Sequence, residues 1–138
     1  MAFSSVHEMI DLCKESGKPL YEVILESDLA ESGLTRAESE AEMHRLWAVM
    51  QATSDGYCGA DRSMSGFAGG DAAKVNAAAA RGVLYADGYF ADVMAEALKT
   101  AECNACMKRI VAAPTAGSCG VLPAVLLPLA RAGQADED

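Results

Sequence analysis

Aromatic and β-branched residues are scarce in this chain of 138 residues. Aromatic side chains make up only 6% of a sequence that is 51% hydrophobic, because alanine, leucine and methionine carry most of its apolar content. This composition disfavours sheets and favours helices that pack closely through small side chains. The length is sufficient for one modest domain with a buried core.

Clusters of basic residues are also absent. The chain has 20 acidic and 11 basic residues, which gives a formal net charge of −9. A surface with this charge repels phosphate backbones and has no basic patch for an acidic membrane. We therefore expect neither a nucleic acid nor a membrane as a partner.

No segment resembles a signal peptide or a membrane span. The N-terminus lacks a basic region, acidic residues interrupt its apolar positions, and the longest apolar runs, such as 121–130, are too short to cross a bilayer. A cytoplasmic location is predicted. The odd number of cysteines favours free thiols over a disulfide framework, and these residues are Cys13, Cys58, Cys103, Cys106 and Cys119.

Local capping signals divide the chain into helices. Two capping boxes, Ser5 with Glu8 and Thr35 with Glu38, each precede apolar residues at helical spacing. Gly17 and the break at 31–33 end the first two helices, the second of which has Pro19 at its first position. Further helices are expected over about 35–53, 71–80, from Asp87 or Gly88 onward, and 120–132. No strand is convincing, so the predicted fold class is all-α, a multi-helix domain with glycine-rich loops.

The least regular stretch, residues 54–70, ends in a glycine-rich segment before a predicted helix. Residues 65–71 read S-G-F-A-G-G-D, with Asp71 as the expected N-cap. Such a loop can wrap a small anion with the Ser65 hydroxyl and with backbone N–H groups. The alternative, which the segment itself does not exclude, is an Asp-capped helix that follows an ordinary loop.

A second cluster of small residues lies in the segment V-A-A-P-T-A-G-S-C-G-V-L-P at 111–123. Gly117 and Gly120 allow the backbone to turn its N–H groups toward one point. A helix that starts at about 118–120 would add its positive dipole end, which favours a carboxylate or a phosphate. The alternative is a turn that only caps a buried helix.

Cys103 and Cys106 form a single C-x-x-C. Two such thiols can bind metal or act in redox chemistry, but no second Cys or His pair lies at structural-zinc spacing. Small apolar side chains on a helix are the simpler explanation. Neither glycine-rich segment matches a nucleotide P-loop.

Three segments together resemble one known family, the iron–sulfur-dependent L-serine dehydratases. They are S-G-F-A-G-G-D-A-A-K at 65–74, N-A-C-M at 104–107 and A-A-P-T-A-G-S-C-G-V-L-P at 112–123. Their order and approximate spacing are similar to those of the family's catalytic α region, a separate α chain or a domain fused behind a β domain. The resemblance implies that 1–138 form the N-terminal part of that domain, and thus an incomplete half of a larger helical fold.

The resemblance also implies the activity and its requirements. These enzymes convert L-serine to pyruvate and ammonia with a 4Fe-4S cluster, whose cysteine ligands lie in segments with no counterpart here. We therefore expect a fragment or a split protein that holds no metal ligands and is inactive alone. The implied small-molecule partner is L-serine. The implied protein partners are a β chain or β domain of the dehydratase, further copies of this chain, or both. No catalytic residue can be assigned, and the expected substrate-binding residues are Ser65, Gly69, Gly70, Asp71, Thr115, Gly117 and Ser118.

The two glycine-rich segments are expected to face one cavity. More than forty residues separate them, enough for two helices to leave and return. Two other functions stay open. One is a non-catalytic helical interaction domain whose exposed final helix binds a protein, and the other is a thiol redox protein that uses Cys103 and Cys106.

Overall fold

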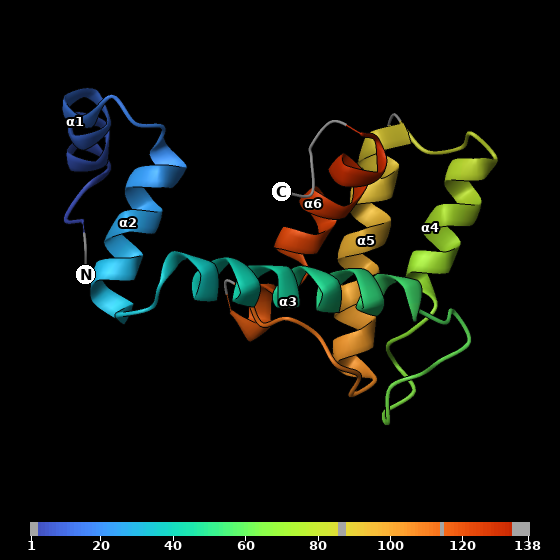
Figure 1. Cartoon of the computed structure of the whole chain (residues 1–138). Helices are drawn as coiled ribbons and strands as arrows, with labels where there is room; N and C mark the ends of the chain where they lie inside the picture. The colour runs from blue at the N-terminus through green and yellow to red at the C-terminus, as the bar shows by residue number, and fades with distance from the viewer. Residues whose placement is uncertain (1–2, 86–87, 114, 134–138) are drawn as a thin grey trace. The chain divides into compact units, whose positions relative to one another are not determined.

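The computed structural model describes residues 3–85, 88–113 and 115–133. Within these ranges the chain forms six α-helices, one short 3₁₀ helix and no strand, which confirms the all-α prediction (Figure 1). The elements are α1 (Val6–Ser16), α2 (Leu20–Ser32), α3 (Arg36–Asp55), α4 (Asp71–Ala80), α5 (Gly88–Ala105), the 3₁₀ helix η1 (Ala116–Ser118) and α6 (Val121–Arg131). Asp87, proposed above as a helix start, lies outside the described residues.

The chain divides into two compact units, Met1–Arg45 and Leu46–Asp138. In the first unit, α1 packs against α2. The Arg36 guanidinium at the start of α3 donates to both carboxylate oxygens of Glu22 in α2, at 3.0 and 2.6 Å. This bidentate pair ties the start of α3 to α2.

The helix ends of the first unit lie where the local sequence signals predict them, with two differences, at Ser5 and at Pro19. At Thr35 both halves of the capping box form, since Glu38 N–H donates to the hydroxyl and the Glu38 carboxylate accepts from the Thr35 N–H. At Ser5 only half forms, because the Glu8 carboxylate turns to the N–H and hydroxyl of Ser4. Gly17 ends α1 in the left-handed conformation, and Pro19 is the N-cap of α2 instead of its first residue.

In the second unit, α5 packs between α4 and α6 (Figure 1). Most of the apolar side chains buried in this packing are small, and Leu127 is the largest of them. Alanines therefore let the three helices approach closely, as the composition predicts. The buried apolar residues of these helices are Ala72, Ala91, Ala95, Cys103, Pro123, Ala124, Leu127 and Pro128.

A buried ionic network joins α3, α5 and α6. Glu96 of α5 is 2% exposed, and its Oε1 accepts from Lys99 Nζ at 2.7 Å and from an Arg131 nitrogen at 2.5 Å. Arg131 and Lys99 also reach the hydroxyl of Ser54 at the end of α3. Burial alone would raise the pKa of Glu96, but hydrogen bonds from Lys99, Ser54 and Arg131 together lower it below its ordinary value.

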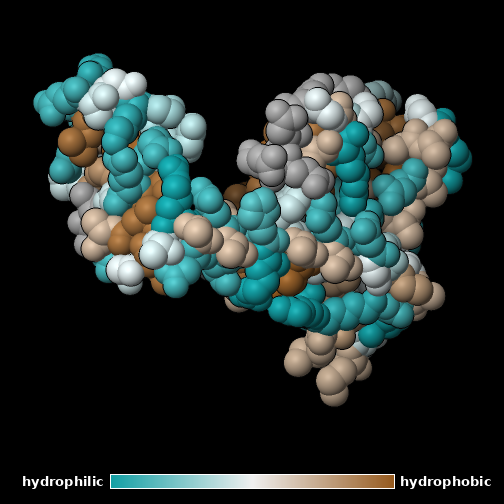
Figure 2. Space-filling view, in the orientation of Figure 1, coloured by the Kyte–Doolittle hydropathy of each residue, from teal (hydrophilic) through white to brown (hydrophobic). Residues whose placement is uncertain are grey.

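The described surface is mixed, because large apolar side chains are exposed on several helices and on the glycine-rich loop, among polar ones. Hydrophilic residues follow much of α3 in Figure 2. Four large side chains of α6 are exposed, namely Val121, Leu122, Val125 and Leu126. Among the described residues, no helix combines the length and apolarity that a bilayer crossing requires.

Candidate functional site

The buried carboxylate of Glu102 binds the end of the glycine-rich loop and the start of α4. Glu102 belongs to α5 and is 6% exposed. Its Oε2 accepts from the Gly70 N–H at 3.0 Å, and its Oε1 accepts from the Asp71 N–H at 2.6 Å. Asp71 was predicted to cap α4, but Gly70 is the N-cap, and Asp71 is instead the first helical residue. The cap of α4 therefore comes from another helix.

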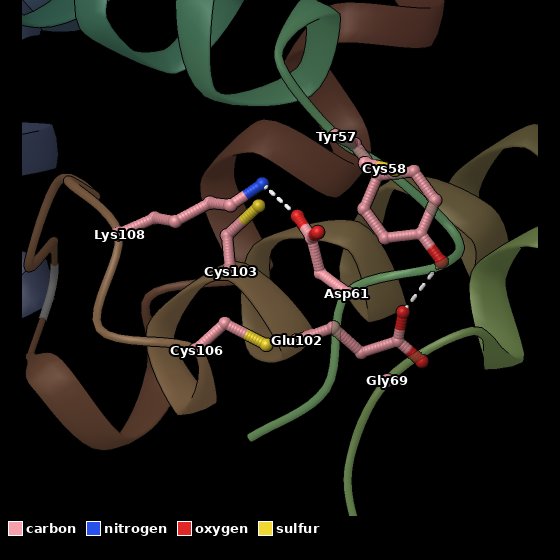
Figure 3. Close-up of a pocket in the computed structure, with 8 residues that line it drawn as sticks. All are labelled: Tyr57, Cys58, Asp61, Gly69, Glu102, Cys103, Cys106 and Lys108. Atoms are coloured by element: carbon pink, nitrogen blue, oxygen red, sulfur yellow. Dashed lines mark hydrogen bonds and ion pairs between the residues drawn. The ribbon is translucent and has the colours of Figure 1, made fainter. Parts of the chain in front are cut away.

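Tyr57 completes the environment of Glu102. Its hydroxyl donates to Glu102 Oε2 at 2.6 Å and accepts from the Ala73 N–H at 3.4 Å (Figure 3). Burial, and next the hydrogen bond to Glu102, raise the pKa of Tyr57 to about 12. The phenol is therefore a permanent donor at neutral pH, and it holds the carboxylate against α4.

Glycine is required where this loop turns back on itself. Gly69 and Gly70 have φ of +129° and +86°. A Cβ at Gly69 would lie 2.2 Å from the carbonyl oxygen of Asp61, and one at Gly70 would lie 2.9 Å from that of Gly59. Ser65 lies apart from the Glu102 contacts, and its exposed hydroxyl pairs with that of Ser63 at 3.1 Å.

A small cavity of about 10 Å³, room for about one water molecule, adjoins Glu102. Figure 3 shows its lining residues, including an ion pair between Lys108 and Asp61 at 2.5 Å. Three of the lining side chains are thiols, those of Cys58, Cys103 and Cys106. Burial raises the pKa of Cys103, so this thiol has less thiolate character than usual. That shift weighs against a thiol redox function.

The iron–sulfur cluster implied by the family resemblance can be tested against these residues. In the described ranges, no group of three or more His, Cys, Asp or Glu side chains is arranged to hold a metal ion. The thiols of Cys58, Cys103 and Cys106 around the small cavity do not form such a group either. The residues present therefore do not fit a cluster, which needs several thiolates around one point.

The second glycine-rich segment forms a turn between α5 and α6. Thr115 is extended, η1 follows, and the hydroxyls of Thr115 and Ser118 pair at 2.9 Å. The turn lies close to α5, because a Cβ at Gly120 would be 3.0 Å from the Ala97 carbonyl oxygen. No side chain caps the start of α6. Pro114 lies outside the described residues.

A groove of about 500 Å³ opens beside this turn. One wall is the turn itself, including Gly117 and Ser118, and the other is the face of α5 that carries Ala97, Ala101 and Asn104. Small side chains leave the backbone of the turn accessible. The groove is mostly apolar, with Asn104 and Ser118 as its polar side chains, and it lies beside a helix start that no side chain caps, which suits a small anion.

Neither of these two cavities is lined by both glycine-rich segments. Gly69 lines the small cavity, whereas Gly117 and Ser118 line the groove. The reason is the position of α5, since Ala97 and Ala101 point to the groove while Glu102, one residue further along the helix, points to α4. The prediction that both segments face one cavity is therefore not met by the small cavity or by the groove.

Sequence reasoning did not identify Glu102 or Tyr57 as site residues. Glu102 lies 31 residues from Asp71 and 45 from Tyr57 along the chain. No local spacing signals such contacts.

Comparisons with known proteins relate this sequence to a family. The family described as "Serine dehydratase alpha chain" matches residues 15–138. The "L-serine dehydratase, alpha chain" of Peptoniphilus asaccharolyticus is 34% identical over 125 residues, which are 90% of this chain and 43% of the relative. The "Probable L-serine dehydratase, alpha chain" of Bacillus subtilis is 32% identical over 124 residues, 90% of this chain and 41% of the relative.

No solved structure matches the chain. The chain spans about two-fifths of the length of these two curated relatives, at 43% and 41%. The family match nevertheless covers nearly all of the chain, including both glycine-rich segments and Glu102. The chain therefore belongs to the serine dehydratase alpha chain family.

Proposed function

We propose that this chain is the substrate-carboxylate-binding part of an L-serine dehydratase, which converts L-serine to pyruvate and ammonia. The observation that carries the proposal is the open groove at the start of α6 in a member of this family. No finding within the described residues favours the alternative of a partner-binding domain.

The turn before α6 suits the carboxylate of L-serine. Dehydration removes the α proton and expels the β hydroxyl, so the substrate must be held in one orientation throughout. The backbone N–H groups at the uncapped start of α6, with its positive dipole end, attract the carboxylate. Thr115, Gly117 and Ser118 would then contact the carboxylate, and Asn104 across the groove adds a polar side chain.

The other predicted residues have a different part in this proposal. The N–H groups of Gly70 and Asp71 already donate to Glu102, so they are not free for a substrate. Gly69 and Gly70 shape the loop, while the exposed hydroxyl of Ser65 stays a candidate for direct substrate contact.

The remaining parts of the enzyme would come from outside this chain. A 4Fe-4S cluster would be held by cysteines that are not in this sequence, and a β chain or β domain, further copies of this chain, or both would complete the assembly. We propose a cytoplasmic location for that assembly. The chain alone would neither form the cluster nor turn over L-serine.

Two preparations test this proposal. The purified chain is reconstituted anaerobically with iron and sulfide, once alone and once with the unmatched part of the Bacillus subtilis α chain. We expect pyruvate from L-serine only in the mixture, and a loss of that activity in Ser118→Ala. Ser39→Ala, at a partly exposed position of α3, is the matched control and keeps full activity. Turnover by the chain alone, or full activity of Ser118→Ala, would contradict the proposal.

A further inference from the structure

We propose that Glu102 is a positioning residue whose carboxylate occupies the anion site at the start of α4 and thereby fixes the glycine-rich loop. As a consequence, the carboxylate of L-serine binds at the α6 groove and not at α4. The consequence rests on the proposed function, whereas the role of Glu102 does not.

Three donors converge on this one carboxylate. The Gly70 N–H and the Tyr57 hydroxyl reach Oε2 at 3.0 and 2.6 Å, and the Asp71 N–H reaches Oε1 at 2.6 Å. Two of them are backbone donors that a helix start leaves without an intrahelical acceptor. The arrangement is that of a bound carboxylate at a helix N-terminus, with the ligand supplied by α5.

The donors come from separate parts of the second unit. Tyr57 follows α3, Gly70 ends the loop, and Asp71 begins α4. One side chain therefore ties the two ends of the loop to α5. Gly69 and Gly70 then pass so close to Asp61 and Gly59 that the loop has little room for another path.

The wild-type chain offers a first test that requires no variant. Amide hydrogen exchange is measured by NMR at Gly70 and Asp71. The comparison is Tyr21, in the first turn of α2, whose N-cap makes no side-chain hydrogen bond. After correction for intrinsic rates, we expect Gly70 and Asp71 to exchange at least about tenfold more slowly than Tyr21. Equal rates would overturn the role of Glu102.

Chemical rescue is the second test. Glu102→Ala leaves a carboxylate-sized space beside the three donors, and we expect its melting temperature to fall by roughly 5 °C or more. Sodium formate should restore at least half of that loss, and sodium chloride at equal ionic strength should not. Glu102→Gln fills the same space. Formate should therefore leave the melting temperatures of Glu102→Gln and of the wild type unchanged.

The outcomes separate the possibilities. A loss of stability that formate does not restore means that Glu102 only fills space, and it overturns the proposal. If Glu102→Ala does not fold, the chemical shifts of the Gly70 and Asp71 amide protons in Glu102→Gln provide the test. They must move upfield as the charged acceptor is lost, and unchanged shifts overturn the proposal.

The consequence for the substrate is tested by titration of L-serine into the same complex used for turnover. We expect the amides of Gly117 and Ser118 to shift while those of Gly70 and Asp71 do not. Shifts at Gly70 and Asp71 would overturn the exclusion of substrate from α4. An absence of any shift, together with slow exchange at Gly70 and Asp71, would contradict the proposed function and leave the role of Glu102 supported.

Discussion

At the scale of single residues, backbone conformation and space decide which glycines matter. Gly66 and Gly69 belong to the same loop, and both have positive φ. A Cβ at Gly66 would meet nothing within 4 Å, whereas one at Gly69 would lie 2.2 Å from the carbonyl oxygen of Asp61. The two positions therefore separate the cost of a left-handed conformation from the cost of a steric clash.

This difference predicts the effect of alanine at each position. Gly66→Ala should lower the free energy of unfolding by about 1–2 kcal/mol, the usual cost of a left-handed conformation. Gly69→Ala should lower it by roughly 3 kcal/mol or more, because the backbone of the loop must also move. Urea denaturation of both variants measures the difference, and equal losses would show that the loop relaxes freely.

The hydroxyl of Ser118 is the second residue-scale case. It pairs with the hydroxyl of Thr115 on the exposed turn and does not cap α6. Ser118→Ala should therefore change the free energy of unfolding by less than about 1 kcal/mol, while it weakens L-serine binding in the reconstituted complex. A clear stability loss without a binding defect would assign Ser118 to the fold instead of the site.

At the scale of helices and loops, caps that lie within four residues of their partners could be predicted from sequence. The ends at Gly17 and Gly33 and the box at Thr35 appear where the pattern places them. The cap of α4 could not be predicted, because its acceptor lies on another helix. The sequence also predicted that both glycine-rich segments face one cavity, whereas Gly69 lines the small cavity and Gly117 and Ser118 line the groove.

The two capping boxes provide a matched pair of variants. Thr35→Ala removes a box with both halves in place, whereas Ser5→Ala removes only the single bond from Glu8 N–H. We expect a loss of about 1 kcal/mol for Thr35→Ala and a smaller one for Ser5→Ala. Loss of helical circular dichroism with temperature is the measurement, and a larger effect at Ser5 would contradict the observed geometry.

At the scale of the whole molecule, the network around Glu96 predicts acid sensitivity. The pKa of Glu96 is lowered from its ordinary 4.5, so its ion pairs stabilise the fold fully above pH 4.5. That stabilisation is lost as the pH falls through the lower, folded-state pKa. Stability of the wild type should therefore fall steeply below about pH 4.5, and less steeply in Glu96→Gln. Parallel pH profiles of the two proteins would refute this contribution.

The non-local cap of α4 also has a kinetic consequence. An alanine-rich helix of 10 residues is too short to persist alone in water. The N–H groups of Gly70 and Asp71 find their acceptor only when Glu102, 31 residues after Asp71 in the chain, arrives with α5. During refolding, α4 is therefore expected to become persistent only after α5 has formed and docked, so the order of assembly in this unit runs against the order of the sequence.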